Sequence, residues 1–240
     1  LLDNNNAQGE YYLTDTMKII KDKGSKVGVF VGATIEELMG VNSRVQLAQA
    51  EATMRKRINK KHMDNGVTII NPENTYIEAN VQIGKDTIIE PGVMLRGNTE
   101  IGDECIIGMN SSITNSKIGN FTEVKISTII DSAVGENTTV GPYAYLRPNS
   151  NVGNHVKIGD FVEVKNANIG DYSKASHLSY IGDADVGKDV NIGCGVVFVN
   201  YDGKNKFRSV VEDGAFIGSN SNLVAPVHVK HKGYIATGST

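Results

Sequence analysis

Isoleucine or valine followed by glycine recurs from about residue 66 to the end of the chain. The apolar members of these pairs are Ile83, Ile101, Ile107, Ile118, Val134, Val140, Val152, Ile158, Ile169, Ile181, Val186, Ile192 and Ile217. The steps between them cluster on six and its multiples, with occasional slips of one residue. A helix would not hold this period with glycine beside each anchor, and simple strand alternation would not single out every sixth position.

Each hexapeptide unit predicts a flat strand, a bend and one aliphatic side chain directed inward. Three such faces make a triangular coil of about 18 residues, and successive coils stack by parallel pairing at roughly 4.8 Å. About 170 residues then give nine or ten coils. The pattern predicts an all-β solenoid of hexapeptide repeats over residues 66–240.

The residues before the repeat have a different pattern. Thr14 to Lys23 predicts a helix opened by Thr14, and Lys26 to Val31 predicts a short strand. Thr34-Ile35-Glu36-Glu37 fits a capping box at a helix start. Ser43 to Asp64 contains no Gly or Pro and is followed by Asn65-Gly66, which predicts a long helix with a stop signal.

Charge and composition narrow the class of protein. Lys and Arg number 24 against 27 Asp and Glu, a net charge of −3, so neither nucleic acid nor an anionic membrane is expected as partner. The sequence contains no run of 18 or more apolar residues, so no segment is predicted to span a membrane. Cys105 and Cys194 stand far apart, so neither a disulfide framework nor a structural zinc site is expected. The chain opens at Leu1 with neither Met nor a signal peptide, and we expect a fragment of a longer protein.

Several motifs then appear in one order along the chain. These motifs are Asn6–Asp15, Gly40–Leu47, Leu146-Arg147-Pro148, Phe161–Lys165, Ser173–Leu178, Asn191-Ile192-Gly193 and Asn200–Gly203. They resemble the hexapeptide-repeat acyltransferases, and among them the bacterial family of bifunctional N-acetylglucosamine-1-phosphate uridylyltransferase/glucosamine-1-phosphate N-acetyltransferases.

The resemblance implies a left-handed parallel β-helix that assembles as a homotrimer in the cytoplasm. It implies transfer of acetyl from acetyl-CoA to the amine of glucosamine-1-phosphate, within an enzyme that then makes UDP-N-acetylglucosamine for cell-wall precursors. Residues 1–41 would be the end of a uridylyltransferase (nucleotidyltransferase) domain, 42–65 a linker helix and 66–240 the acetyltransferase domain.

Uridylyl transfer is not expected from this chain. The nucleotide-binding Gly-rich loop and the metal-binding Asp of the family's first domain would lie upstream of Leu1. Asn42 matches the family's second Mg²⁺ ligand, but Mg²⁺ requires about six oxygen ligands, usually including carboxylates. An N-cap for the linker helix is at least as good an interpretation of Asn42.

His177 is the candidate general base among the five histidines. The segment around it matches the family's catalytic strand, in which this histidine deprotonates the sugar amine. Imidazole titrates near pH 6.5 in model peptides, which suits a base at neutral pH. The family motif suggests that Glu163 orients or tunes it, and a solvated carboxylate is the alternative. A histidine chosen without the motif would more often be structural.

Arg147 and Lys165 each follow an apolar anchor and stand 18 residues apart, one full coil. They should stack on one face, where two cations repel unless an anion lies between them. A sugar phosphate fits such a clamp, and two splayed, solvated side chains are the alternative. By resemblance, Tyr180 and Asn191 also contact the sugar.

The stretch from Phe198 to Ser209 contains no hexapeptide anchor and predicts a loop excursion. By resemblance Asn200 and Tyr201 contact acetyl-CoA, and Lys206 reaches the sugar-phosphate site of a neighbouring subunit. Cys194, Ser219 and Thr237 occupy further acetyl-CoA positions, and the family usually has a small residue such as Ala where this chain has Cys194 and Thr237. The chain ends at Thr240, before the family's C-terminal arm.

The sequence leaves three other functions open. Another hexapeptide-repeat acyltransferase could act on an amino acid or a lipid precursor, which the Asn6–Asp15 segment disfavours. A γ-class carbonic anhydrase on the same scaffold would need three histidines around zinc, and His177, His228 and His231 lack an obvious coil-to-coil spacing for it. The last is an inactive β-helix that only holds a trimer together.

Overall fold

The computed structural model describes residues 2–34 and 37–240. The chain forms two compact units, residues 1–50 and 51–240, and each is described separately. The division falls inside the long helix α2 (Arg44–Asp64). None of the described helices is both long and apolar enough to cross a bilayer.

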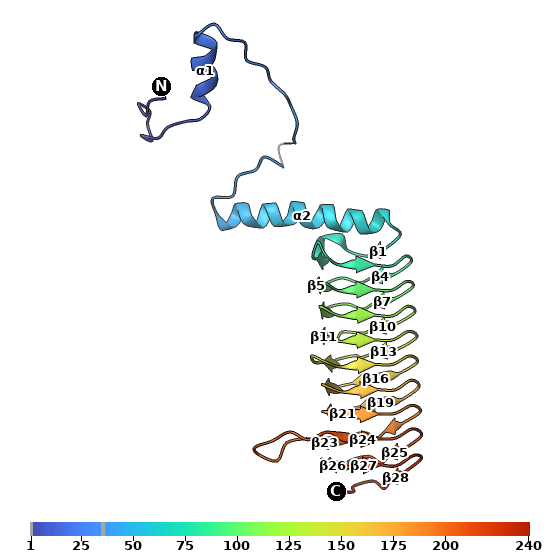
Figure 1. Cartoon of the computed structure of the whole chain (residues 1–240). Helices are drawn as coiled ribbons and strands as arrows, with labels where there is room; N and C mark the ends of the chain where they lie inside the picture. The colour runs from blue at the N-terminus through green and yellow to red at the C-terminus, as the bar shows by residue number, and fades with distance from the viewer. Residues whose placement is uncertain (1, 35–36) are drawn as a thin grey trace. The chain divides into compact units, whose positions relative to one another are not determined.

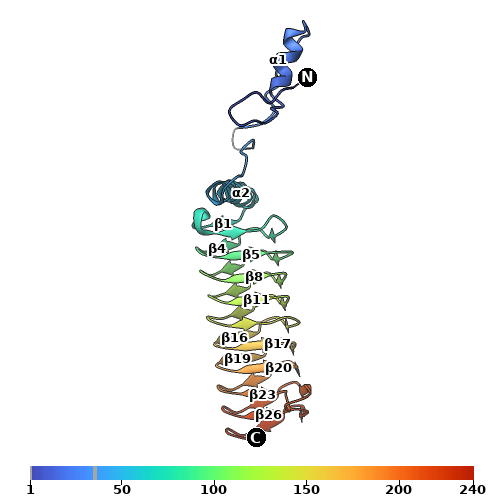
Figure 2. The same ribbon diagram turned by 90° about the vertical axis from the view of Figure 1, so that its left-hand side faces the viewer.

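Residues 51–240 contain a parallel β-solenoid whose coils stack one upon another (Figures 1 and 2). Three parallel sheets form its faces, and we call them A, B and C in the order in which the chain visits them. Sheet A consists, in spatial order, of β1 (Thr68–Ile69), β4 (Ile88–Ile89), β7 (Ile106–Ile107), β10 (Glu123–Val124), β13 (Thr139–Val140), β16 (Lys157–Asp160), β19 (Lys174–His177), β22 (Asn191–Ile192), β25 (Phe216–Ile217) and β28 (Tyr234–Ile235).

The other two sheets repeat this order one face further along each coil. Sheet B consists of β2 (Tyr76–Ile77), β5 (Met94–Arg96), β8 (Ser112–Thr114), β11 (Thr128–Ile130), β14 (Tyr145–Leu146), β17 (Glu163–Lys165), β20 (Tyr180–Gly182), β23 (Val197–Val199) and β26 (Asn222–Val224). Sheet C consists of β3 (Gln82–Ile83), β6 (Glu100–Ile101), β9 (Lys117–Ile118), β12 (Ala133–Val134), β15 (Asn151–Val152), β18 (Asn168–Ile169), β21 (Ala184–Val186), β24 (Ser209–Val211) and β27 (His228–Val229). A short 3-10 helix, η1 (Pro72–Asn74), precedes β2.

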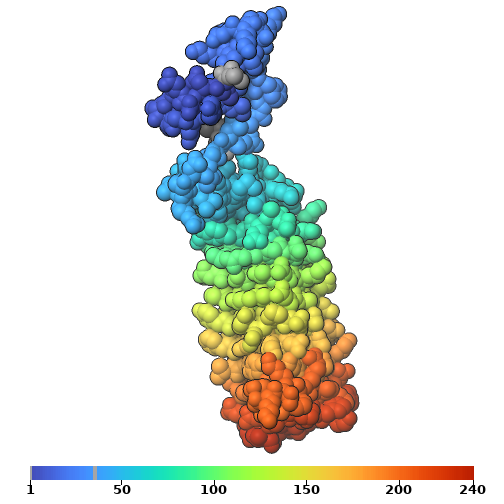
Figure 3. All heavy atoms as spheres, turned by 60° about the vertical axis from the view of Figure 1, so that its left-hand side comes forward, coloured from blue at the N-terminus to red at the C-terminus, as the bar shows by residue number. Residues whose placement is uncertain are grey.

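The aliphatic anchors of the repeat form the core, each stacked on its counterpart in the next coil. Ile89 pairs with Ile107 in sheet A, and Leu146 pairs with Val164 in sheet B; all four are fully buried. Burying such a side chain contributes roughly 1.5–3 kcal/mol. The predicted hexapeptide solenoid is confirmed, and the space-filling view shows its coils as closely stacked layers (Figure 3).

Buried hydroxyl groups join neighbouring coils at the bends. Thr138 Oγ1 accepts a hydrogen bond from the backbone N of Val156 at 3.1 Å and donates one to the carbonyl of Gly153 at 2.9 Å. Thr122 makes the same two bonds one coil earlier, to Thr138 and Gly135. Buried polar backbone groups that would otherwise lack a partner are satisfied in this way, so each hydroxyl fixes the register of two coils. Thr87 and Ser173 make the equivalent pair of bonds.

Replacing Thr138 with Val should therefore destabilise the solenoid, because the Val156 N–H and the Gly153 carbonyl each lose the hydroxyl. We expect a loss of roughly 1–3 kcal/mol in the free energy of unfolding, measured by urea denaturation. Thr138→Ser keeps the hydroxyl and is the control. Equal stability of the Val and wild-type proteins would show that these bonds do not hold the register.

The helix α2 starts and stops as its sequence signals predict, with one correction. Ser43, not Asn42, is its N-cap: Ser43 Oγ accepts from the backbone N of Gln46 at 3.2 Å, while Asn42 donates its backbone N–H to Gln46 Oε1. At the other end Gly66 adopts φ +94°, the left-handed conformation that terminates many helices.

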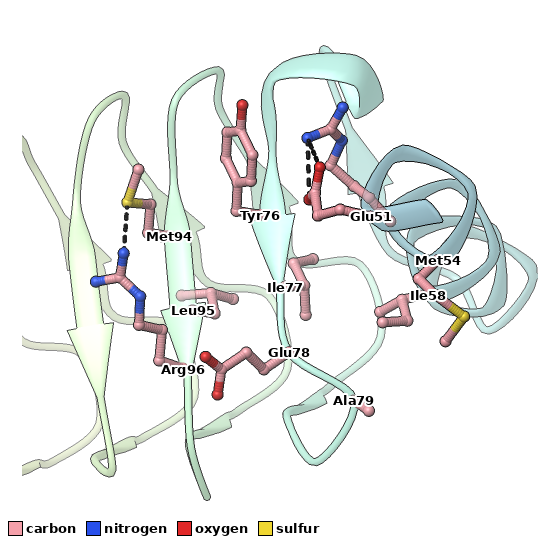
Figure 4. A pocket seen from close by; sticks show the side chains of 11 residues that line it. Glu51, Met54, Ile58, Tyr76, Ile77, Glu78, Ala79, Met94, Leu95 and Arg96 are labelled. Atoms are coloured by element: carbon pink, nitrogen blue, oxygen red, sulfur yellow. Dashed lines mark hydrogen bonds and ion pairs between the residues drawn. The ribbon is translucent and has the colours of Figure 1, made fainter. Parts of the chain in front are cut away.

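From residue 51 onward, α2 packs on the first coil of the solenoid (Figure 4). Asn59 is fully buried, and its Nδ2 donates to the carbonyls of Pro72 at 2.8 Å and Thr75 at 3.0 Å. The guanidinium of Arg55 lies 4.7 Å from the centre of the Tyr76 ring. A cavity of about 390 Å³ opens beside these residues, several coils away from His177.

The unit formed by residues 1–50 contains the helix α1 (Asp15–Asp22), as the sequence predicts. Thr14 does not cap it with its side chain. The strand predicted for Lys26 to Val31 is wrong, since this segment has no strand pairing in the described residues and Val29, Phe30 and Val31 are exposed. The capping-box segment includes residues 35 and 36, which lie outside the described residues.

Candidate active site

A single column of side chains follows the line where sheet A turns into sheet B, which we call the A/B edge. Asp160 in β16 pairs directly with His177 in β19. β19 pairs with β22, β22 with β25 and β25 with β28, and each pairing adds one residue to the column. Read coil by coil, the column is Asp160, His177, Cys194, Ser219 and Thr237. The predicted base and three predicted acetyl-CoA positions therefore lie in one line.

His177 forms a hydrogen bond with a carboxylate in the preceding coil. Its Nδ1 lies 2.8 Å from Asp160 Oδ1, and this bond is the main cause that holds the pKa of Asp160 below its ordinary value. The His177 side chain is 59% exposed, so a ligand can reach it. Gly159 permits the close approach of the two strands here, because a Cβ at this position would lie 1.9 Å from the carbonyl oxygen of Ser176.

The expected partner of His177 was Glu163, and the structure places Glu163 elsewhere. Glu163 Oε1 accepts from Arg147 Nη1 at 2.8 Å across neighbouring strands of sheet B. Asp160 is not among the residues predicted from the sequence, although its distance of 17 residues from His177 is one coil. That spacing is the available signal, whereas the family motif points to Glu163, whose carboxylate contacts Arg147 in this structure.

Arg147 and Lys165 lie one coil apart on sheet B, as the spacing predicts, since Leu146 pairs with Val164 and these residues follow directly. They do not form an unbalanced pair of cations. Arg147 is paired with Glu163, which is the first cause of its raised pKa, and Lys165 Nζ lies 3.2 Å from Asp183 Oδ2. The carboxylates of Glu163 and Asp183 therefore offset the repulsion between the two cations without a bound anion.

Asp183 is the centre of a buried polar cluster at the line where sheet B turns into sheet C, the B/C edge. Asn166 Nδ2 donates to its Oδ1 at 2.6 Å, and Asn200 Nδ2 donates to its Oδ2. Burial alone would raise the pKa of Asp183, but the hydrogen bonds from Asn166, Lys165 and Asn200 hold it below its ordinary value. Asn200 also donates to Tyr180 Oη at 3.3 Å, so its amide is directed into the protein and supports the start of the following loop.

The predicted loop lies between β23 and β24 and projects from the B/C edge (Figure 1; orange in Figure 3). Tyr201 and Lys206 form an isolated antiparallel bridge across it, and both side chains are exposed. Arg208 ties its end to the solenoid through two bonds to Asp185, at 2.5 and 2.6 Å. The loop is therefore fixed at both ends while its tip is open to a partner. Asn191, by contrast, lies exposed on sheet A, in register with Lys174.

Metal binding is not supported at the positions considered from the sequence. Among the described residues no group of three or more His, Cys, Asp or Glu side chains could hold a metal ion. His228 instead hydrogen-bonds Glu212 Oε1 at 2.6 Å, and the backbone N of His231 donates to the same carboxylate at 2.7 Å. Asn42 alone does not supply the oxygen ligands that Mg²⁺ requires, so the residues of this chain do not fit that ion.

Comparisons with known proteins show which proteins this chain is similar to. Residues 80–115 and 131–166 match the family model described as Bacterial transferase hexapeptide (six repeats). Over all 240 residues the chain is 77% identical to the bifunctional protein GlmU of Clostridioides difficile strain 630, of which it spans 52%. The chain is homologous to the bifunctional GlmU proteins. It is also 68% identical over 239 residues to GlmU of Alkaliphilus oremlandii, and it spans about half the length of these curated relatives.

The solved structures that are similar to this chain have much lower sequence identity to it. UDP-N-acetylglucosamine acyltransferase from Campylobacter jejuni aligns over 64% of this chain and 72% of its own, with 16% identity and a TM-score of 0.44. The acetyltransferase domain of PglB from Neisseria gonorrhoeae, in complex with acetyl coenzyme A, aligns over 60% of this chain and 64% of its own, with 14% identity and a TM-score of 0.41.

Proposed function

We propose that this chain transfers the acetyl group of acetyl-CoA to the amine of glucosamine-1-phosphate, as one half of a bifunctional enzyme. The observation that carries the proposal is the A/B edge, where His177 has a carboxylate partner and lies in line with the acetyl-CoA positions Cys194, Ser219 and Thr237. Whole-length similarity to GlmU proteins supports it.

His177 would act as general base through its second ring nitrogen, Nε2. The sugar nitrogen attacks the thioester carbonyl carbon while Nε2 takes one proton from the amine, so a C–N bond forms. The tetrahedral intermediate then collapses, the C–S bond breaks, and the CoA thiolate leaves with the proton returned by the imidazolium. The products are the amide and the CoA thiol, and no acyl-enzyme is needed. Cys194 therefore serves as a small surface residue in this account, not as a nucleophile.

The phosphate of the sugar would bind at Arg147 and Lys165. A guanidinium carries five N–H donors and an ammonium three, so their bonds to Glu163 and Asp183 leave donors for phosphate oxygens. The two carboxylates hold both heads in place before the ligand arrives, which lowers the entropic cost of binding. Tyr180 lies in register with Glu163 on the same sheet and would contact the sugar, as would Asn191.

The acetyl-CoA positions lie on two different edges of the solenoid, and this supports a homotrimer. Cys194, Ser219 and Thr237 are on the A/B edge, whereas Asn200 and Tyr201 begin the loop at the B/C edge. One cofactor would meet both sets where the B/C edge of one chain lies against the A/B edge of the next. Lys206 in the exposed loop tip would then enter the neighbour's sugar site. Three such heterologous contacts close a ring.

An exposed apolar column on the A/B edge supports the same contact. Tyr143, Phe161 and Leu178 occupy one position in consecutive coils and are 55%, 57% and 59% exposed. Each has positive φ, which is unusual for bulky side chains and turns them outward at the bend. A contiguous apolar strip of this kind is typical of an interface.

The longer protein would also carry a uridylyltransferase domain that uses Mg²⁺, and would make UDP-N-acetylglucosamine for cell-wall synthesis in the cytoplasm. This chain spans 52% of its GlmU relative from Clostridioides difficile, and the uridylyltransferase activity would need residues from the rest of that length.

Replacement of His177 with Ala should lower turnover of glucosamine-1-phosphate and acetyl-CoA by about 10²–10⁴-fold, the usual contribution of a positioned base. Product formation is measured by chromatography of the N-acetylated sugar phosphate. His155→Ala is the matched control, because His155 stacks on Tyr172 at a different bend. Wild-type turnover in His177→Ala would remove His177 from the mechanism.

Replacement of Phe161 with Glu should dissociate the trimer, since it would place a charge in the apolar column. Sedimentation equilibrium at micromolar concentration should show trimeric wild type and smaller species for the variant. Tyr172→Glu is the control: Tyr172 is 52% exposed, has positive φ and is stacked on a ring, but it lies at the bend before sheet A. A wild-type protein that is monomeric throughout this range would contradict the assembly.

A further inference from the structure

We propose that Asp160 is the positioning residue of His177, and that its carboxylate sets which ring nitrogen acts as base. This inference deepens the proposed function and rests on it. The two residues face each other across β16 and β19, with Nδ1 and Oδ1 2.8 Å apart. A carboxylate can only accept a hydrogen bond here, so Nδ1 must carry the proton, and the lone pair of neutral His177 is then on Nε2.

The backbone holds this pair in place. The backbone N of Leu178, next to His177, donates to the carbonyl of Asp160 at 2.8 Å, so both residues are fixed to the same point of the sheet. Gly159 allows the strands to close up, as described above. Within the described part of the chain Nε2 has no hydrogen-bond partner, which leaves it available to the amine.

The negative charge of Asp160 supports the same role. When His177 takes a proton, Asp160 is the anion in direct contact with the imidazolium, which favours the protonated base that forms during transfer. The other titratable groups on neighbouring strands are Lys157 on β16, Lys174 on the strand of His177, the Cys194 thiol in the next coil, and Tyr180 and Glu163 on sheet B. Glu163 is engaged by Arg147, so it does not replace Asp160.

Two substitutions separate orientation from charge. In Asp160→Asn the amide oxygen can still accept from Nδ1–H, but the charge is lost. In Asp160→Ala both are lost. Glu123→Gln is the matched control, since Glu123 is another carboxylate on sheet A that pairs with a cation, Lys125 at 3.0 Å, in an earlier coil.

The tautomer of neutral His177 is read by long-range ¹H–¹⁵N NMR, which does not depend on activity. We expect Nδ1–H in the wild type and in Asp160→Asn, and loss of this preference in Asp160→Ala. Neutral His177 protonated on Nε2 in the wild type would overturn the proposal.

The split between kcat and KM tests the charge. Without the carboxylate, the imidazolium that forms during transfer lacks its counter-charge, so kcat of Asp160→Asn should fall roughly tenfold with little change in KM for acetyl-CoA. A kcat of Asp160→Asn equal to those of the wild type and Glu123→Gln would contradict the charge role.

The two readouts distinguish this proposal from the function on which it rests. If Asp160 sets the tautomer but His177→Ala retains full turnover, the proposed base is wrong while the Asp160–His177 contact is real. If His177→Ala is inactive and Asp160→Ala leaves both the tautomer and kcat unchanged, the proposed function stands and the positioning role of Asp160 is refuted.

Discussion

Parallel in-register stacking of the coils decides which side chains of this protein can meet. Backbone bonds between coils and buried hydroxyls such as that of Thr138 fix the register at every bend. Each residue therefore has one neighbour in the coil before and one in the coil after. The contacts that define the site obey this rule: the His177–Asp160, Arg147–Glu163 and Lys165–Asp183 pairs span 17, 16 and 18 residues. A slip of one residue in the coil that carries Asp160, Glu163 and Lys165 would separate all three pairs.

The same rule shows what the sequence could predict. The repeat of Ile and Val predicts the solenoid and the relative placement of Arg147 and Lys165, because the period of the anchors is the geometry of the coil. The repeat does not predict which carboxylate each cation or imidazole contacts. Coil length varies from 16 to 25 residues, and the direction of a side chain depends on the bend that carries it. The family motif points to Glu163 as the partner of His177, whereas Asp160 is found by counting one coil back from His177. The strand expected at Lys26 to Val31 failed because its pairing depends on neighbours that local pattern does not reveal.

The distribution of the candidate residues over two edges is the main functional consequence of this geometry. The proposed base and the three proposed acetyl-CoA positions follow the A/B edge, whereas the loop with Tyr201 and Lys206 leaves the B/C edge, held by Asp183 and Arg208. Edges of one triangular coil face different directions, so the proposed site would require two chains. Assembly and activity would then be linked, because a stable single chain would hold the proposed base without the neighbour's loop that completes its site.

Mixing of two inactive variants tests this link most directly. His177→Ala lacks the base at the A/B edge, and Lys206→Ala lacks the loop cation at the B/C edge, so neither homotrimer should have appreciable activity. After unfolding and joint refolding of equal amounts, random assembly should place an intact A/B edge against an intact loop in about a quarter of all sites. The account predicts that acetyl transfer returns to about a quarter of the wild-type rate. Mixed trimers that remain as inactive as the parents would contradict it, and would place the whole site within one chain.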